Sequence, residues 1–297
     1  MSKNKIRNTR ADTIFHLMNN TLLLIFFLLV IIPLISVVSH SISDPMTVYS
    51  GKVFLLPKNL SLISYQTLLN DPRIGQGYLN TIFYTVVGTM INLVMTVMAA
   101  FPLSRKYFYG RKFFNLMFTF TMLFSGGLIP RYFLVRDLGM LDTVWAMMIP
   151  GAMSVWNVMI CRTAFSTTIS DDLQEAAALD GCGDIYFIIR IVIPLSGSIL
   201  AVMALLYAVG HWNAYFDAMI FLDSERLYPL QLILRSIFAS SQMNDLTGDF
   251  KEQAMRTALV ETMKYSLIVV ASLPLMIAYP FVQKFFVKGV MIGSLKG

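Results

Sequence analysis

LLLIFFLLVIIPLISVV, residues 22–38, is an apolar run without a charged side chain. It forms most of a longer apolar segment from Ile14 to Val38, and roughly 20 such residues in an α-helix cross the hydrocarbon core of a bilayer. The whole chain follows the same trend. Of its 297 residues, 56% are hydrophobic and 13% are charged, against roughly 25% charged residues in a soluble domain. The sequence therefore predicts an all-α polytopic membrane protein.

Further apolar segments of similar length follow the first one and predict about six transmembrane helices in a single membrane domain, residues 1–297. The predicted spans are about residues 14–38, 81–103, 113–135, 143–165, 196–222 and 261–282. The first segment could be a signal peptide, because basic residues precede it. It is longer than the apolar core of a typical signal peptide and lacks a small-residue cleavage site, which favours a membrane helix.

Basic residues lie at the ends of the apolar segments rather than on one polar face, so the net charge of +6 indicates membrane topology and not nucleic-acid binding. The positive-inside rule places three groups in the cytoplasm: Lys3, Lys5, Arg7 and Arg10; Arg105, Lys106, Arg111 and Lys112; and Lys284, Lys288 and Lys296. Both termini are then cytoplasmic, with segments 39–80 and 223–260 outside the cell membrane and segment 166–193 inside. Arg131 and Arg136, in a short outer turn, oppose this topology.

The sequence lacks the patterns expected of a catalytic or metal-binding protein. It contains no GxxxxGK[ST] loop for a nucleotide phosphate, and no His-x-x-x-His or Cys-x-x-Cys metal spacing. Cys161 and Cys182 indicate no disulfide framework. We therefore assign no catalytic residue, no metal ligand and no cofactor to this chain.

The inner segment STTISDDLQEAAALDGCGDIYFIIRIVIP, residues 166–194, is the most informative polar stretch. Ser170 and the acids after it are typical of a helix N-terminus. Gly181 and Gly183 end this short helix, since glycine tolerates a positive φ. Asp184 is then expected to cap a second, apolar helix that runs to Pro194. The segment predicts a helix, a tight turn and a second helix.

This segment resembles the EAA loop of ATP-binding-cassette (ABC) importer permeases, whose pattern is EAA-x3-G-x9-I-x-L-P. Glu175-Ala176-Ala177, Gly181, Ile191 and Pro194 match it, and Ile193 replaces the usual leucine. The resemblance implies a coupling helix that docks on an ATPase subunit, where ATP and Mg²⁺ bind. The residues that it assigns to this contact are Glu175, Ala176, Ala177, Asp180 and Gly181.

Other stretches resemble the second permease of maltose-type importers, in a subgroup of Bacillus-like bacteria that takes complex oligosaccharides such as those from pectin or alginate. They are Phe124–Pro130, Gly210–Asn213, Leu227–Gln231 and the tail from Phe281 to Gly297. The resemblance implies a second permease subunit (a heterodimer), two ATPase subunits, an extracellular solute-binding protein, an oligosaccharide and membrane lipid as partners, and sugar import as the function.

Polar and aromatic residues in the predicted fifth span are candidates for sugar contact, because polar groups inside a membrane are costly. On one helix Asn213 and Asp217 would share a face, flanked by aromatic rings. The alternative is an interfacial aromatic belt. The candidates for the substrate pathway are Trp212, Asn213, Phe216 and Asp217, and more weakly Trp156 and Asn157 in the fourth span.

The long outer segment and the tail are further candidate contacts. Leu227–Arg235 is apolar enough to pack along the membrane surface, and the stretch after it suits a mobile polar loop. The resemblance to maltose-type permeases implies that this loop reaches the binding protein. The residues of that contact are Gln242, Asn244 and Asp245. The resemblance also implies that the tail extends into a cleft of the ATPase pair through Lys288, Gly289 and Lys296. For both segments the alternative is a merely exposed, solvated stretch.

Two other functions compete with ATP-driven import. One is a proton-coupled secondary transporter with His211 and Asp217 as a proton relay. The other is a membrane scaffold that transports nothing. An intramembrane enzyme has the least support, because no nucleophile–base pair is present.

Overall fold

The computed structural model describes residues 9–243 and 250–294 of the chain. Within these ranges the chain folds into helices, and no β-strand is present apart from an isolated bridge between Ser43 and Leu60. The prediction of an all-α membrane protein is confirmed.

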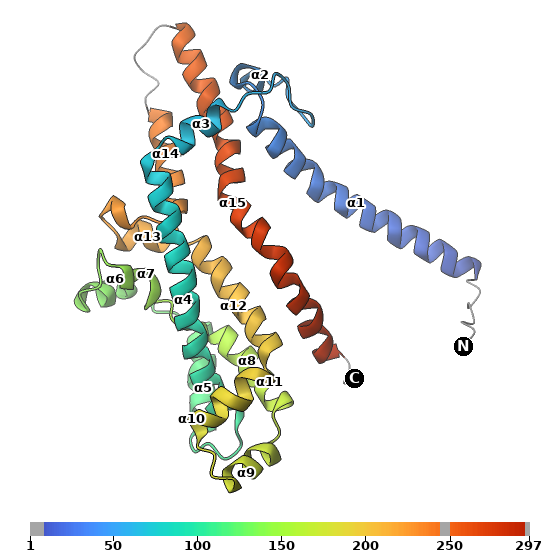
Figure 1. Ribbon diagram of the computed structural model, residues 1–297, viewed down its shortest axis with the longest axis vertical. Helices are drawn as coiled ribbons and strands as arrows, with labels where there is room; N and C mark the ends of the chain where they lie inside the picture. The colour runs from blue at the N-terminus through green and yellow to red at the C-terminus, as the bar shows by residue number, and fades with distance from the viewer. Residues whose placement is uncertain (1–8, 244–249, 295–297) are drawn as a thin grey trace. The chain divides into compact units, whose positions relative to one another are not determined.

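The elements follow one another along the chain as drawn in Figure 1. They are α1 (Arg10–Ser41), α2 (Pro45–Tyr49), α3 (Ile63–Leu69), α4 (Pro72–Ser104), α5 (Arg111–Leu123), α6 (Leu128–Asp137), α7 (Val144–Met148), α8 (Val155–Thr168), α9 (Asp171–Leu179), α10 (Asp184–Phe187), the π-helical turn η1 (Ile188–Val192), α11 (Ile193–Leu195), α12 (Gly197–Trp212), α13 (Phe216–Phe221), the 3₁₀ turn η2 (Glu225–Leu227), α14 (Leu230–Met243) and α15 (Phe250–Ser294).

Three helical segments are long and apolar enough to cross a membrane: Arg10–Ser41, Pro72–Ser104 and Gln253–Pro280. They contain most or all of the first, second and sixth predicted spans. Two bent helix pairs qualify when each is taken together, α5 with α6 at 114° and α10–α11 with α12 at 86°. The described residues therefore hold three to five candidate spans.

The third, fourth and fifth predicted spans are not continuous helices, which corrects the sequence interpretation. The third bends before Gly127, whose φ of +85° favours glycine. The fourth is split into α7 and α8 around Pro150, which lacks a backbone donor. The fifth is split into α12 and α13. Hydropathy averages over such breaks, so it does not detect them.

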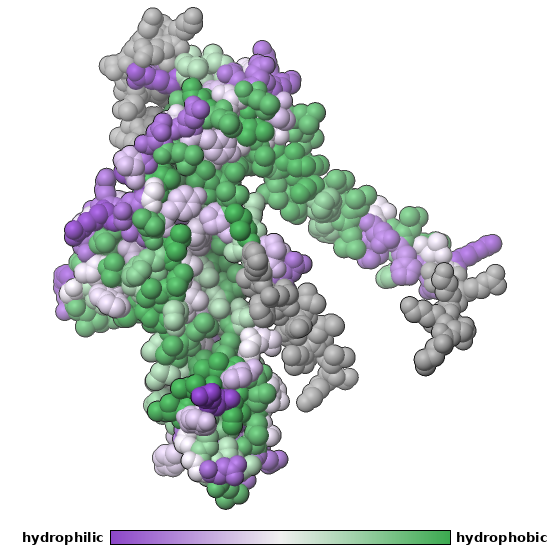
Figure 2. Space-filling view, in the orientation of Figure 1, coloured by the Kyte–Doolittle hydropathy of each residue, from purple (hydrophilic) through white to green (hydrophobic). Residues whose placement is uncertain are grey.

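The chain forms two compact units, and the first consists of residues 1–70 and 238–272. Its helix α1 is apolar on all faces, and in Figure 2 its hydrophobic surface gives way to hydrophilic side chains toward the N-terminal end. Buried hydroxyl groups connect the end of α1 with α3 and α15 in this unit. Ser266 lies 3.0 Å from Ser64 and 3.3 Å from the carbonyl of Ser41, whose own hydroxyl accepts from Tyr65 at 2.8 Å.

The second unit, residues 71–237 and 273–297, is built around α4, which packs against α8 and α12 (Figure 1). Its largest core lies where these helices meet and includes Phe101, Phe165, Phe187 and Tyr207. Close approach of α4 and α12 requires Gly88, because a Cβ there would come within 2.5 Å of the His211 ring.

The start of α14 also packs on α4, and not along the membrane surface as its apolar sequence suggested. Leu230 and Ile233 are buried, and the Leu230 amide donates to Thr81 Oγ1 at 2.8 Å. This contact depends on Gly77, since a Cβ there would lie 3.1 Å from the Cα of Leu230 and 2.6 Å from Ile233 Cδ1.

Gly77 and Gly75, both in α4, give a matched test of this packing. Gly77→Ala should lower the thermal stability of the purified transporter, because the added methyl group forces backbone or side-chain shifts that typically cost about 1–3 kcal/mol. Gly75→Ala has open space around its Cβ, and alanine favours a helix, so its melting temperature should be unchanged or higher. Equal melting temperatures for the two variants would contradict the close contact.

Candidate functional site

The short helix α9 carries the EAA sequence and forms as the sequence predicts. Ser170 is its N-cap, and its side chain accepts a hydrogen bond from the Leu173 amide at 3.2 Å. Asp171 and Asp172 follow in the first turn, where the helix dipole favours negative charge. The helix runs from Asp171 to Leu179 in the region of Figure 1 beyond the ends of α4 and α8.

A Schellman turn ends this helix and depends on Gly181. The Cys182 amide donates to the Ala177 carbonyl at 2.9 Å, and the Gly181 amide donates to the Ala178 carbonyl at 3.0 Å. Gly181 has a φ of +79°, as the sequence predicts for this position. Asp184 is the first residue of α10 rather than its cap, because Gly183 occupies the N-cap position.

The two sides of α9 have different environments. Gln174 and Ala177 are buried against the rest of the unit, whereas Glu175, Ala176 and Asp180 are exposed. Leu179 is 90% exposed, which is unusual for a leucine and indicates a surface that a partner can cover. The five residues assigned to the coupling contact therefore lie on α9 and the turn after it, and four of them have exposed side chains or, for Gly181, exposed backbone.

Arg105 is the main polar anchor beside α9 and is fully buried. Its guanidinium donates to the carbonyl oxygens of Phe165 at 2.9 Å and Ile169 at 3.0 Å, at the C-terminal end of α8. It also donates to Ser104 at 2.9 Å and lies 3.6 Å from the Asp171 carboxylate. Burial lowers the pKa of Arg105, and the charge of Asp171 opposes this effect. One side chain thus joins the ends of α4 and α8 to the first turn of α9.

The two residues after Arg105 contact the same helix. Lys106 Nζ lies 3.3 Å from the Asp171 carboxylate, and the Tyr107 hydroxyl hydrogen-bonds with the side-chain amide of Gln174. The sequence interpretation treated Arg105 and Lys106 as topology signals only and did not mention Tyr107. Nothing in the sequence distinguishes Arg105 from other basic residues near span ends, because its burial depends on α8.

The predicted sugar contacts are only partly brought together. Asn213 follows the last residue of α12 and donates back to the Val209 carbonyl at 2.9 Å, whereas Asp217 lies in α13. The expectation that they share one helix face is wrong, because the helix breaks between them. Asp217 instead forms a two-point ion pair with Arg131 of α6, at 2.8 and 3.0 Å. This ion pair neutralises the charge of Arg131, one of the two basic residues that opposed the predicted topology.

The aromatic candidates have unlike environments. Trp212 is buried, with its ring 6.4 Å from that of Tyr78, whereas Phe216 is 46% and Trp156 is 59% exposed. Asn157 is buried in α8. Beside the break between α12 and α13, the guanidinium of Arg235 from α14 lies over the Tyr215 ring at 4.7 Å, a contact that the sequence interpretation missed.

His211 and Asp217 have separate partners. His211 Nε2 lies 2.6 Å from Asn92 Oδ1, between α12 and α4, whereas Asp217 pairs with Arg131. Within the described residues no group of three or more metal-ligating side chains occurs. The arrangement favours structural roles for both residues over a direct proton relay.

Several predicted contact residues cannot be placed in the site. Asn244, Asp245 and Lys296 lie outside the described residues, and the side chains of Gln242 and Lys288 and the surroundings of Gly289 are not described. Helix α15 continues through Ser294, so Lys288 and Gly289 lie in a helix, and their contact with an ATPase stays a prediction.

Known proteins with similar sequence and structure support the resemblance. No protein-family model matches the chain. The chain is 36% identical over 287 residues to the polygalacturonan/rhamnogalacturonan transport system permease protein YtcP of Bacillus subtilis, covering 96% of this chain and 99% of that protein. It is 35% identical to protein LplC of the same organism, covering 98% of each. A bacterial ABC transporter involved in the import of the acidic polysaccharide alginate has a chain of the same fold, with 36% identity and a TM-score of 0.84, covering 95% of this chain and 100% of that one.

The broken apolar helices and the exposed EAA helix define a membrane transport subunit. The chain belongs to the permease family of ABC sugar importers. This confirms the family resemblance and the transport function predicted from the sequence, and it does not favour a proton-coupled transporter or a scaffold. The chain is an integral membrane protein.

Gly181 provides a test of the turn after α9. Gly181→Ala should reduce both uptake and substrate-stimulated ATPase activity of the assembled transporter, because a left-handed φ costs an alanine about 1–2 kcal/mol. No atom lies within 4 Å of the added Cβ, so the effect would come from backbone strain and not from a clash. Gly183→Ala, at a φ of −73°, is the control and should leave both activities near normal. Normal activities in the Gly181 variant would contradict the need for this turn.

Arg105 provides a test of the anchor. Arg105→Gln should lower thermal stability and uncouple ATP hydrolysis from uptake, because buried carbonyl groups lose their donors at about 1–3 kcal/mol for each unsatisfied group. Arg105→Lys should restore little of the thermal stability or of the coupling, since an ammonium group cannot reproduce the forked geometry of the guanidinium group. Lys106→Gln, at an 83% exposed side chain, should have a small effect. Similar losses in the Lys106 and Arg105 variants would show that the buried geometry is unimportant.

Proposed function

We propose that the chain forms one half of the translocation pathway of an importer for acidic oligosaccharides, which carry uronic acid carboxylates. The observation that carries the role in ATP-driven import is the arrangement of α9, held on one side by Arg105 and exposed on the other. That arrangement suits a helix that receives motion from an ATPase and passes it to α4 and α8. The names of two relatives, for polygalacturonan and for alginate, support an acidic substrate.

The contact between Arg235 and Tyr215 supports the same substrate class. Arg235 is exposed and forms no ion pair with a carboxylate among the residues that the structure describes. A guanidinium can bind a carboxylate through two parallel hydrogen bonds, and an aromatic ring can stack on the apolar face of a sugar. Arg131 is less available to a substrate carboxylate, because Asp217 already binds it. The uronate contact is therefore assigned to Arg235, with Tyr215 and the exposed Phe216 beside it.

The partners follow from this role. A second permease subunit would complete the pathway, and two ATPase subunits would bind ATP and Mg²⁺, with no cofactor on this chain. Glu175, Ala176, Asp180 and Gly181 would face the ATPase, and the end of α15 would approach the same partner. With both termini cytoplasmic, the segment around Gln242 would face an extracellular solute-binding protein.

Uptake by membrane vesicles that contain the complete transporter tests the proposal. A galacturonic acid trisaccharide should enter in an ATP-dependent manner, also when the proton gradient is dissipated, whereas neutral maltotriose should enter poorly. Uptake that persists without ATP would contradict the ABC mechanism, and equal uptake of the two sugars would contradict the acidic substrate.

The Arg235 contact has its own test in the same vesicles. Arg235→Gln should raise the KM for the acidic trisaccharide about tenfold, because hydrogen bonds to charged groups contribute roughly 1.5–3 kcal/mol. Arg226→Gln, at an exposed residue of the neighbouring 3₁₀ turn, is the matched control. An unchanged KM in the Arg235 variant would remove this residue from the pathway.

A further inference from the structure

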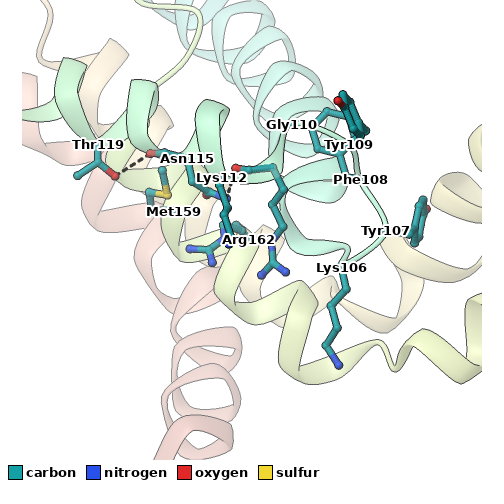
Figure 3. A pocket seen from close by; sticks show the side chains of 11 residues that line it. Lys106, Tyr107, Phe108, Tyr109, Gly110, Lys112, Asn115, Thr119, Met159 and Arg162 are labelled. Carbon is teal, nitrogen blue, oxygen red and sulfur yellow. Dashed lines mark hydrogen bonds between the residues drawn. The ribbon is translucent and has the colours of Figure 1, made fainter.

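A groove with a cavity volume of about 740 Å³ lies beside the segment that links α4 to α5. Figure 3 shows its lining side chains, which come from this segment, the first part of α5 and the facing part of α8. The residues that decide its chemistry are Lys106, Arg111, Lys112, Asn115, Met159 and Arg162. The groove does not include the exposed face of α9 or the break between α12 and α13.

The groove has four basic side chains and no acidic one among its lining residues. Arg111 and Arg162 both direct Nε to the carbonyl oxygen of Leu103, at 3.1 and 3.4 Å, so two guanidinium groups converge on one point. Both side chains are half-buried, and neither forms an ion pair with an acid within the described ranges. Lys106 is partly neutralised by Asp171. Like charges held this close repel each other, so a bound anion would stabilise the arrangement.

The character of the groove changes along α5. Arg111, Asn115 and Thr119 line it at successive helical turns, and the last two donate back to the carbonyls of Arg111 and Asn115 at 2.8 Å. Thr119 thus uses its hydroxyl proton, and Asn115 one of its two amide hydrogens, within the helix. Met159 of α8 faces the same part. The groove is therefore cationic at the start of α5 and nearly neutral further along.

The end of α5 continues this change. Beyond Thr119, on the side of α5 that continues the groove, the helix exposes Met122 at 43% and Leu123 at 70%. A helix that exposes such residues beyond a basic end is typical of a segment that meets lipid at the membrane–water interface. A ligand that fits the groove and this surface is negatively charged at one end and apolar at the other.

We propose that this groove binds the phosphate group of an anionic phospholipid, with the acyl chains along the apolar end of the groove side of α5, at Met122 and Leu123. Arg111 and Arg162 bind the phosphate oxygens through their free N–H groups, and Lys112 adds a third positive charge. Basic pockets between membrane helices on the cytoplasmic side are known to hold anionic headgroups. The bound headgroup would join α5 to α8 next to Arg105 and Lys106, so it would brace the anchor of α9.

Lipid retention by the assembled transporter tests this proposal independently of sugar transport. The transporter is purified from nanodiscs with equal amounts of phosphatidylglycerol and phosphatidylcholine, and retained lipid is counted by native mass spectrometry. The wild type should retain phosphatidylglycerol in preference to phosphatidylcholine. Arg111→Gln/Arg162→Gln should lower this preference about 25-fold, because one basic residue near an anionic surface contributes roughly a fivefold change.

The controls distinguish a lipid site from general surface charge and from a site for a free anion. Lys52→Gln/Lys58→Gln removes the same charge from an exposed loop and should keep the preference. Lys112→Gln, at an exposed side chain with little influence on folding, should lower the preference about fivefold. Addition of inorganic phosphate should leave the bound phosphatidylglycerol in place, because the acyl chains contribute to binding.

Three results would overturn the proposal. One is equal retention in the Arg111/Arg162 and Lys52/Lys58 variants. Another is complete displacement by inorganic phosphate, which would indicate an anion site without lipid. The third is loss of the second permease subunit from the Arg111→Gln/Arg162→Gln complex while Arg111→Lys/Arg162→Lys keeps it, which would indicate a subunit contact.

Discussion

The guanidinium of Arg105 lies out of reach of water and donates to two carbonyl groups at the end of α8 and to Ser104. Removing a charge from water costs several kcal/mol unless every donor is satisfied. The buried position therefore holds only while α4, α8 and the start of α9 keep their relative places. Asp171 in the first turn of α9 lies 3.6 Å from this guanidinium, so a movement of α9 would either move α4 and α8 with it or break this ion pair. This constraint would supply rigidity for the coupling role that is proposed for α9.

The interrupted helices shape the region of the second unit around α12, α13 and α14. A break in an apolar helix exposes backbone groups that must find partners, and a membrane protein tolerates such a break where protein or water surrounds it. The break between α12 and α13 places Tyr215 beside Arg235 and Asp217 beside Arg131. The breaks therefore build the polar surface on which sugar contact is proposed.

The sequence predicted the local features well and the contacts between distant segments poorly. Ser170, the acids after it and Gly181 act within a few residues, so the helix and turn of the EAA segment follow from short-range rules. Asn213 and Asp217 were placed on one helix because a smooth hydropathy profile hides a break of a few residues. Leu227–Arg235 looked like a membrane-surface segment because apolar composition does not tell lipid from a neighbouring helix.

The sequence alone determined the all-α membrane class, the family and the local structure of the EAA segment, because apolar length, capping residues and a spaced motif are properties of neighbouring residues. Only the tertiary structure decided that Arg105 is a buried anchor, that Asp217 pairs with Arg131, and that Arg111 and Arg162 converge on one carbonyl. Each of these facts joins residues about 50 or more positions apart. The partner of a charge is set by packing, and packing depends on the whole fold.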